Sequence, residues 1–416
     1  MTVFPNYDGV INASLKLKGL IRVTPLDLNK RLSNSFGASI FLKREDLQQI
    51  RSFKIRGAYN KISSLNSEDR GKGIICASAG NHAQGFAYSC KKLQIRGEIY
   101  MPATTPKQKI TQVKMFGGEY IKVILSGDTY DTCQKIALRS SQRQKKTFVH
   151  PFDDPKVIEG QATIATEMLG QRPKGFDYII VPIGGGGLIS GLITVLKLVS
   201  PNTKIIGVEP EGAPSMKKSI EKGKLVSLKE IDKFVDGAAV KKVGDLTFKI
   251  CKSNLEKIIL VPEGKICQSI LDLYNKDGIV AEPAGALAIA ALDYLKEEIK
   301  NKAVGVILCG GNNDILRMPE IKERALLFAK LKHYFLINFP QRSGALKQFV
   351  ADILGPNDDI THFRFTKKNF RDNAPAVIGI ELKYPEDLKL LINKMKKHKF
   401  KFDYLNENEE LFQFLI

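Results

Sequence analysis

Tryptophan is absent from the 416-residue sequence, and cysteine and histidine are scarce, with six and five residues. No Cys-x-x-Cys pair occurs and no two histidines lie four residues apart, so we expect no metal site. The cysteines lie mostly in apolar surroundings, which predicts reduced core residues of a cytoplasmic protein rather than a disulfide framework. The first residues also lack the basic and then apolar arrangement of a secretory signal peptide.

Long uncharged segments are also scarce. Residues Tyr178–Leu196 run for 19 residues without a charge, which is close to the length of a transmembrane helix. This segment contains Pro182 and five glycines, four of them consecutive, and glycine loses much conformational freedom when it enters a helix. We therefore predict a strand, a turn and a helix here, and no membrane association.

The charge of the chain is strongly basic. Lysine and arginine number 64 against 44 acidic residues, which gives a net charge of +20 and a pI of about 9.5. Such an excess raises the question of a nucleic-acid partner. The basic residues are spread in short pairs among acidic ones, however, and no helix-turn-helix or zinc-finger signature occurs. A lysine-rich surface exposed to water explains the charge better, and we expect no nucleic-acid partner.

Hydrophobic residues make up 43% of the chain, enough for the cores of two or three domains. In the first three quarters of the chain, short apolar strands alternate with helical patterns, which predicts parallel sheets covered on both faces. We expect two open sheets with a cleft between them, and sites at the carboxyl ends of their strands. The expected strands are 40–44, 73–77, 97–101, 120–124, 178–183, 204–209, 258–261 and 303–308, with helices including 11–20, 157–169 and 188–199.

The pattern changes near Lys330. Two amphipathic helices now lie among four apolar strands. This β-α-β-β-α-β order is that of the ferredoxin-like module. The expected strands are 333–339, 360–367, 375–382 and 402–405, and the expected helices are 345–354 and 388–395.

A helical pattern begins at Ser52, which we expect to be its N-cap. Lys54 then falls in the first turn beside an apolar face, where burial and the positive end of the helix dipole both disfavour a protonated amine. An uncharged amine is what imine chemistry requires, because only the free base attacks a carbonyl. Taken alone, Lys54 is better explained as an ordinary solvated lysine, since lysine and arginine number 64 in this chain.

Two segments are suited to binding anions. Gly184–Gly187 follow an expected strand and precede a helix, so their backbone N–H groups and the helix start favour a phosphate. No Gly-x-Gly-x-x-Gly sequence runs through this loop, which argues against a dinucleotide site. Ser78, Ala79, Gly80 and Asn81 likewise end a strand and begin a helix, an arrangement suited to a substrate carboxylate. Asn81 is equally explained as a helix N-cap.

Four motifs occur here in the same order as in pyridoxal-phosphate enzymes of fold type II. They are Ser-Phe-Lys-Ile-Arg-Gly-Ala at 52–58, Ser-Ala-Gly-Asn-His at 78–82, Gly-Gly-Gly-Gly-Leu at 184–188 and Glu-Pro-Ala-Gly-Ala at 282–286. Within that group the chain resembles the short biosynthetic threonine dehydratases over nearly its whole length.

The resemblance implies an α/β, tryptophan synthase β-like fold, with two open parallel-sheet subdomains and a C-terminal ferredoxin-like (ACT-like) domain. It places the catalytic domain at 1–328, with a large subdomain of residues 1–55 and 153–328 and a small one of residues 56–152. The regulatory domain then spans 332–416.

The resemblance also assigns roles to residues. It implies that Lys54 forms an imine with pyridoxal 5'-phosphate and then acts as the general base. It implies that Asn81 donates to the ring hydroxyl, and that Cys309 faces the pyridine nitrogen where these enzymes usually have serine. A thiol is a weak donor, and Cys309 is also explained as a small core residue. The implied cofactor-binding residues are Phe53, Lys54, Asn81, Gly184, Gly185, Gly186, Gly187, Leu188 and Cys309, and the substrate-binding ones are Ser78, Ala79, Gly80, Asn81 and Glu282.

We therefore expect deamination of L-threonine to 2-oxobutanoate and ammonia, the first committed step of isoleucine biosynthesis, by a cytoplasmic homotetramer. L-Serine is an alternative substrate, and isoleucine or valine is the expected effector of the C-terminal domain, unless that domain only assembles subunits. Two other functions stay open. One is a serine dehydratase, racemase or synthase with the same cofactor, and the other is a non-catalytic amino-acid sensor. A divalent cation near Glu209, where some relatives bind one, is not expected, because Ala213 and Ser215 follow it.

Overall fold

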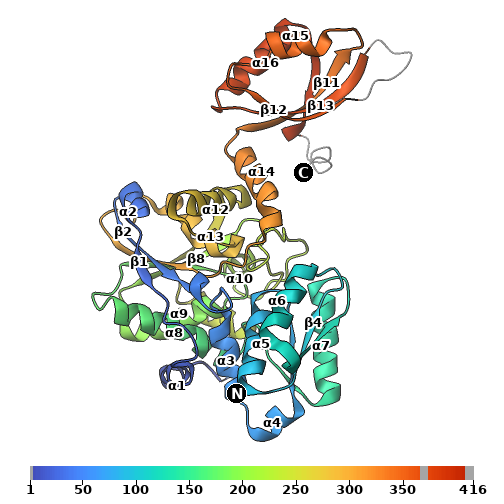
Figure 1. Ribbon diagram of the computed structural model, residues 1–416. Helices are drawn as coiled ribbons and strands as arrows, with labels where there is room; N and C mark the ends of the chain where they lie inside the picture. Colours follow the sequence, from blue (N-terminus) through green and yellow to red (C-terminus); the bar gives the residue numbers. More distant parts are fainter. Residues whose placement is uncertain (1–2, 366–372, 408–416) are drawn as a thin grey trace. The chain divides into compact units, whose positions relative to one another are not determined.

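The computed structural model describes residues 3–365 and 373–407, and the chain divides into two compact units, Met1–Asp314 and Ile315–Ile416 (Figure 1). Each unit has its own sheets and its own buried core. Mostly parallel strands followed by helices build the first unit, and antiparallel strands build the second. The expected fold class is confirmed.

The larger sheet of the first unit is parallel except at one edge, where β1 pairs antiparallel with β2. Its central strands are apolar on both faces because helices cover both sides, as Figure 1 shows. In sheet order, the strands are β1 (Leu26–Leu28), β2 (Ser39–Arg44), β10 (Ala303–Leu308), β7 (Tyr178–Pro182), β8 (Lys204–Pro210) and β9 (Lys257–Val261). The covering helices include α8 (Pro155–Gln171), α9 (Gly187–Val199), α12 (Glu263–Asp277) and α13 (Pro283–Ala290).

The smaller sheet of the first unit is parallel throughout. In sheet order its strands are β5 (Ile121–Leu125), β4 (Gly97–Met101), β3 (Ile74–Ala77) and β6 (Thr147–Phe148). Phe86 of α5 and Val113 of α6 pack with Ile99 in the core on one face. Cys133 and Ala137 of α7 pack against the other face. These helices are α5 (Asn81–Leu93), α6 (Lys107–Gly117) and α7 (Tyr130–Gln144).

The second unit has the ferredoxin-like order that the sequence predicts. Its sheet is antiparallel, with neighbouring strands β12 (Asp359–Phe365), β13 (Asn373–Glu381), β11 (Lys332–Pro340) and β14 (Lys401–Tyr404). Phe349 of α15 and Met395 of α16 pack on the sheet residues Phe335 and Ile378. The helices of this unit include α14 (Met318–Phe328), α15 (Ala345–Asp352) and α16 (Asp387–Lys397).

Further helices of the first unit join the sheets and carry site residues. They are α1 (Tyr7–Leu17), α2 (Lys30–Phe36), α3 (Lys54–Ser63), α4 (Ser67–Lys72), α10 (Ser215–Glu221) and α11 (Asp245–Lys252), and the 3-10 helix η1 (Glu45–Leu47) follows β2.

The expected strands agree with the observed ones to within one or two residues where the structure describes them. Residues Tyr178–Leu196 form β7, a turn and most of α9, as predicted. Within the described part of the chain, no helix is both long and apolar enough to span a bilayer. The expected helix at 11–20 instead begins at Tyr7 and ends at Leu17, because Lys18 leaves the helical conformation and Gly19 has a φ of +75°. The short strands β1 and β6 were not predicted, since two or three residues show no periodicity.

Candidate active site

Lys54 is the first residue of α3, as expected, but the predicted N-cap at Ser52 is wrong. Phe53 occupies the N-cap position without a side-chain hydrogen bond. Ser52 instead forms an isolated bridge with Gly310, and its buried hydroxyl has no partner among the described residues. This bridge ties the start of α3 to the chain just after β10, so Lys54 lies at the carboxyl end of the large sheet.

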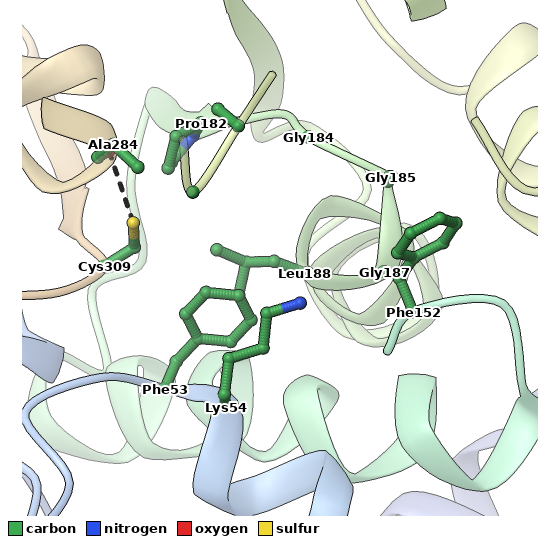
Figure 2. Close-up of a pocket in the computed structure, with 13 residues that line it drawn as sticks. Phe53, Lys54, Phe152, Pro182, Gly184, Gly185, Gly187, Leu188, Ala284 and Cys309 are labelled. Carbon is green, nitrogen blue, oxygen red and sulfur yellow. Dashed lines mark hydrogen bonds between the residues drawn. The ribbon is translucent and has the colours of Figure 1, made fainter. Parts of the chain in front are cut away.

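A pocket opens in front of Lys54, and Figure 2 shows its amine pointing toward the glycine loop that precedes α9. Most of the expected cofactor-binding residues line this pocket together, although they are separated by up to 256 positions in the sequence. The lining residues are Phe53, Lys54, Phe152, Pro182, Gly184, Gly185, Gly186, Gly187, Leu188, Gly237, Ala238, Ala284 and Cys309.

The glycine loop has no room for side chains. A Cβ on Gly185 would lie 2.2 Å from the ring of Phe152, and one on Gly187 would lie 2.9 Å from the Cβ of Phe152. Gly186 has a φ of +91°, a backbone angle that residues other than glycine rarely adopt. The loop therefore exposes bare backbone to the pocket at the start of a 13-residue helix, whose first N–H groups have no intrahelical acceptor.

The amine of Lys54 lies in an environment that disfavours its charge. Burial lowers the pKa of Lys54 to about 8, while the nearby Cys309 and Glu282 oppose this shift. Its Nζ donates a hydrogen bond to the carbonyl oxygen of Pro151 at 2.9 Å. About a tenth of an amine with this pKa is uncharged at pH 7, far more than for an ordinary lysine. The shift is in the direction expected from the position of Lys54 beside an apolar face.

The segment around Pro151 is held in place by neutral histidines. His82 donates from Nε2 to the carbonyl oxygen of Val149 at 3.0 Å, and His150 accepts at Nδ1 from the backbone N–H of Asp153 at 2.8 Å. Burial lowers the pKa values of His82 and His150 to about 3 and about 4, so both rings are uncharged at neutral pH. The carbonyl that receives the Lys54 amine is thus fixed from both sides.

Asp153 connects this segment to the glycine loop. Its carboxylate accepts from the backbone N–H groups of Asp245, Leu246 and Thr247 at 2.9 to 3.2 Å and so caps α11. Thr247 in turn donates to the carbonyl oxygen of Gly185 at 2.7 Å. The loop and the Lys54 partner therefore share one rigid support.

Asn81 begins α5 and is not its N-cap, because Gly80 precedes it in that position. Its Nδ2 donates to Oε1 of Glu282 at 2.6 Å, and its Oδ1 accepts from Asn312 at 2.7 Å. Burial raises the pKa of Glu282 to about 7, and the hydrogen bond from Asn81 opposes this. Asn81 and Glu282, 201 positions apart, form a polar pair beside Gly310, next to the pocket residue Cys309.

The thiol of Cys309 donates to the carbonyl oxygen of Ala284 at 3.3 Å (Figure 2). Burial raises its pKa well above the ordinary value, so Cys309 carries its proton at neutral pH. It lines the pocket as a neutral, weak donor.

The remaining predicted residues lie at the edge of this arrangement. Ser78, Ala79 and Gly80 are half-buried at the turn before α5 and are not among the residues that line the pocket. The hydroxyl of Ser78 accepts from the backbone N–H of Gly80 at 3.2 Å, which shapes that turn.

Several site residues were not predicted as such. Phe152, Gly237, Ala238 and Ala284 line the pocket from three separate loops or helix starts. Their residue types are ordinary in a hydrophobic core. The one sequence signal near them was the motif at 282–286, which contains Ala284.

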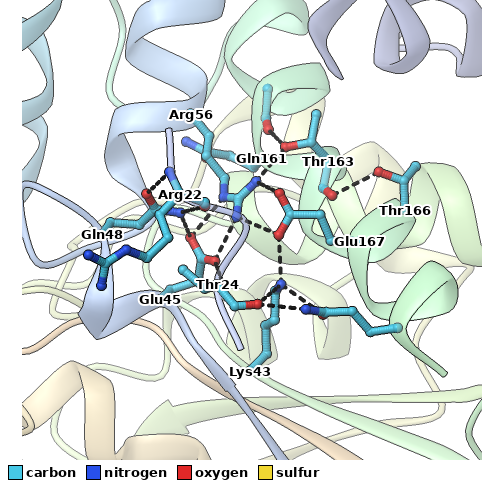
Figure 3. Close-up of polar contacts among 12 residues, drawn as sticks. Arg22, Thr24, Lys43, Glu45, Gln48, Arg56, Gln161, Thr163, Thr166 and Glu167 are labelled. Atoms are coloured by element: carbon cyan, nitrogen blue, oxygen red, sulfur yellow. Dashed lines mark hydrogen bonds and ion pairs between the residues drawn. The ribbon is translucent and has the colours of Figure 1, made fainter. Parts of the chain in front are cut away.

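A buried ionic cluster surrounds Arg56, two residues after Lys54 on α3 (Figure 3). The guanidinium of Arg56 forms paired hydrogen bonds with Glu45 and with Glu167 at 2.6 to 2.8 Å, and its Nη1 also donates to Thr163. Lys43 donates to Glu167 at 2.6 Å, so two cations face two carboxylates. The cluster joins β2, η1, α3 and α8, which fixes the helix that carries Lys54.

Glu209 at the end of β8 is fully buried, and burial raises its pKa to about 7. Its two oxygens accept from the backbone N–H groups of Met216 and Lys217 at 2.7 and 2.8 Å. Within the described part of the chain, no group of three His, Cys, Asp or Glu residues is arranged to hold a metal ion.

Comparisons with known proteins agree with this geometry. Residues 17–310 match the family of pyridoxal-phosphate dependent enzymes, and residues 323–415 match the C-terminal regulatory domain of threonine dehydratase. The sequence is 55% identical to that of L-threonine dehydratase biosynthetic IlvA from Halalkalibacterium halodurans, over 98% of this chain and 99% of that protein. The chain belongs to the biosynthetic threonine dehydratases. The predicted family is thereby confirmed, together with its pyridoxal-phosphate dependence.

Solved structures show the same fold in enzymes with more than one name. The processed form of threonine deaminase isoform 2 from Solanum lycopersicum is 40% identical, with a TM-score of 0.72 over 78% of this chain and 90% of that one. Maize serine racemase is 30% identical, with a TM-score of 0.71 over 78% of this chain and 98% of that one. The fold of a threonine dehydratase therefore does not by itself fix the reaction.

The pocket of this threonine dehydratase fits pyridoxal phosphate on two structural grounds. The glycine loop is a cradle whose missing side chains leave backbone N–H groups for a phosphate. The Lys54 amine opens into the same pocket, within reach of an aldehyde on the same molecule. Phe53, Leu188 and Cys309 supply apolar and neutral walls for a ring.

Proposed function

We propose that this chain deaminates L-threonine to 2-oxobutanoate and ammonia, as the first committed step of isoleucine biosynthesis. The observation that carries the proposal is the meeting of an amine of lowered pKa with a side-chain-free glycine loop in one pocket. Pyridoxal phosphate supplies an electron-withdrawing ring that stabilises negative charge at the substrate Cα. The chain itself supplies the base, the phosphate cradle and the contacts that orient the substrate.

Lys54 is the proposed cofactor attachment site and general base. Its uncharged Nζ accepts the proton from the substrate Cα, and the pKa of about 8 suits a base that works near neutral pH. The fixed carbonyl of Pro151 holds the amine at the pocket wall whenever that amine is not bound to the cofactor. Loss of the proton from Cα and of hydroxide from Cβ together removes one water molecule. Hydrolysis of the resulting product then consumes one water molecule and releases 2-oxobutanoate and ammonia.

The other residues bind and orient. Gly184–Gly187 and Leu188 hold the cofactor phosphate, and Phe53 packs beside the Lys54 stem, with the Nζ 5.3 Å from the ring centre. Cys309 would face the pyridine nitrogen of the bound cofactor as a protonated thiol. A weak donor leaves that ring nitrogen near neutral, so charge at Cα is spread less and prompt loss of the β-hydroxyl is favoured.

Asn81 donates to the cofactor ring hydroxyl. The start of α5, with Ser78, Ala79 and Gly80, receives the substrate carboxylate, because a 13-residue helix presents free N–H groups there. Glu282 orients the substrate beside Asn81.

Substitution of Lys54 tests the proposal directly. Lys54→Ala is expected to remove both the yellow absorbance of covalently held cofactor and threonine turnover, because no other amine of the pocket lining can replace it. The matched control is Lys91→Ala, which removes an exposed lysine of α5 and leaves both unchanged. An active Lys54→Ala enzyme would refute the assignment.

Serine racemase or serine dehydratase activity is the alternative, which the likeness to maize serine racemase supports. Assays of the purified protein with L-threonine, L-serine and their enantiomers separate the two. We expect turnover of L-threonine above that of L-serine and no racemisation. The 55% identity to a biosynthetic threonine dehydratase favours this outcome.

The domain division that we propose is a catalytic domain at 1–328, with a large subdomain of residues 1–55 and 153–328 and a small one of residues 56–152, and a regulatory domain at 332–416. We propose isoleucine or valine as the effector, a cytoplasmic location, a homotetrameric assembly and no nucleic-acid partner. No further step of the proposal depends on the assembly state.

One cavity in the second unit supports an amino-acid effector. It is lined by Leu327, Lys330, His333, Leu388, Tyr404, Asn406 and Glu407. An ammonium-bearing Lys330 and a carboxylate-bearing Glu407 at one cavity suit the two charges of an amino acid, and Leu327 and Leu388 suit an aliphatic side chain.

A further inference from the structure

The side-chain amide of Asn312, four residues beyond the end of β10, lies among three oxygen acceptors. Its Nδ2 lies 2.8 Å from the carbonyl oxygen of Ile50, 2.7 Å from Oδ1 of Asn81 and 3.0 Å from Oε1 of Gln84, so its two hydrogens are shared among three acceptors. The Ile50 oxygen belongs to the backbone and cannot exchange places with a donor. The amide of Asn312 must therefore present its nitrogen, and not its oxygen, to these three acceptors.

This arrangement has a consequence for Asn81. Because Asn312 presents a donor, Asn81 must place its Oδ1 as the acceptor. The Nδ2 of Asn81 then faces Oε1 of Glu282 at 2.6 Å. If the Asn81 amide were flipped by half a turn, its oxygen would face the Glu282 carboxyl and its nitrogen would face the donor nitrogen of Asn312. The contact with Asn312 would be lost, as would the contact with an ionised Glu282. Asn312 therefore selects one of two amide orientations that are otherwise nearly equal in shape.

We propose that Asn312 is a positioning residue that fixes the side-chain amide of Asn81 with its donor nitrogen on the cofactor side. The proposal rests on the proposed contact between Asn81 and the cofactor ring hydroxyl. The nitrogen of Asn81 lies 3.3 Å from where a Cβ on Gly310 would be, next to the pocket residue Cys309. One of its two hydrogens goes to Glu282, which leaves the other for the ring hydroxyl.

The backbone around Asn312 supports the same conclusion. The Gly311 N–H donates to the carbonyl oxygen of Arg51 at 2.9 Å, and the Phe53 N–H donates to that of Cys309 at 3.2 Å. Asn312 is therefore anchored to the loop that leads into Lys54. A side chain anchored in this way selects the orientation of its neighbour without touching the reacting atoms.

A double-mutant cycle on cofactor affinity tests the proposal. The dissociation constant of pyridoxal phosphate is measured by absorbance titration of stripped full-length protein for wild type, Asn81→Ala, Asn312→Leu and the double variant. We expect each single substitution to raise the dissociation constant about tenfold, which is the loss of one hydrogen bond. In the Asn81→Ala background, Asn312→Leu is expected to add less than about twofold, because its effect acts through Asn81.

The outcomes distinguish the inference from the function on which it rests. If Asn81→Ala weakens cofactor binding and Asn312→Leu does not, or if Asn312→Leu weakens it equally in both backgrounds, the positioning role is wrong and the proposed function stands. If Asn81→Ala leaves the affinity unchanged, the cofactor contact of Asn81 and the positioning role both fail.

A general loss of stability is controlled in two ways. Asn66 caps α4 by accepting a hydrogen bond from the Asp69 N–H at 2.7 Å and is not among the residues that line the pocket. Asn66→Ala is expected to lower the thermal midpoint without changing the cofactor dissociation constant. If Asn312→Leu does not fold, Asn312→Asp is measured in its place, since aspartate has nearly the same volume as asparagine. The aspartate places an oxygen where the donor nitrogen was, facing the same three acceptors, so it can no longer select the orientation of the Asn81 amide. An unchanged dissociation constant in Asn312→Asp overturns the proposal.

Discussion

At the scale of single residues, burial shifts the pKa values of the groups around the pocket toward their uncharged forms. It lowers the pKa of Lys54 to about 8, raises that of Cys309 and holds His82 and His150 neutral. Lys54, Cys309 and His82 each have a defined hydrogen-bond partner, and His150 accepts from two backbone N–H groups. The chemistry therefore depends on side chains whose protonation state is shifted by desolvation and whose direction is set by hydrogen bonds.

Cys309 offers a test of how much the ring contact depends on sulfur. Cys309→Ser keeps a neutral donor of similar size facing Ala284, so we expect kcat/KM for L-threonine within about tenfold of wild type. Cys309→Ala, which has no donor, is the comparison. A loss of more than about a hundredfold in the serine variant, about 2.7 kcal/mol, would show that the thiol itself has a specific role.

At the scale of elements, α3 is the helix on which the site depends. Lys54 projects from its first turn into the pocket, and two residues later Arg56 anchors the same turn in the ionic cluster. A salt bridge buried in this way contributes little net stability, but removing one partner leaves the opposite charges buried and unpaired. The cluster therefore holds the first turn of α3 in one position, because any displacement of Arg56 would leave buried charges unpaired.

Arg56→Met should expose that dependence. With Lys43 left alone against Glu45 and Glu167, the substitution is expected to reduce the free energy of unfolding by about 3–5 kcal/mol. Urea denaturation of the full chain measures this. Lys249→Met, which breaks the exposed pair with Asp245 on α11, is expected to change it by less than about 1 kcal/mol. Equal effects of the two substitutions would contradict the anchoring role of Arg56.

Elements were predictable from the sequence because they depend on neighbours in the chain. The run Tyr178–Pro182 is apolar throughout and is followed by glycines, so β7 and the start of α9 could be placed within one residue. The N-cap at Ser52 could not, because the chain there bridges to Gly310, some 258 positions away. A local capping pattern cannot reveal a competing long-range contact.

At the scale of the whole molecule, the site is a product of long-range contacts. The motif resemblance predicted Lys54, Cys309 and the glycine loop at one place, and the structure brings them together. It did not predict the wall formed by Phe152 or the link from Asn312 to Asn81, 231 positions apart. Such residues are recognised only by what folding places beside them, since a phenylalanine or an asparagine has no distinctive pattern of its own.

The second unit provides the last prediction. If its cavity holds the effector, isoleucine should inhibit threonine turnover by the full-length enzyme, and both Lys330→Met and Glu407→Gln should raise the inhibitory concentration at least about tenfold. Each substitution removes one charge that would pair with the zwitterion. Basal turnover without isoleucine is expected to stay unchanged, because the two residues belong to a separate unit.

Lys347→Met supplies the matched control, since this exposed lysine of α15 is not part of the cavity lining. Valine is titrated in parallel, because it shares both charges and differs by one methylene group, which is worth about 1 kcal/mol in an apolar pocket. Inhibition that Lys330→Met and Glu407→Gln leave intact would place the effector elsewhere. Resistance in these two variants but not in Lys347→Met would tie regulation of the enzyme to charges at this one cavity.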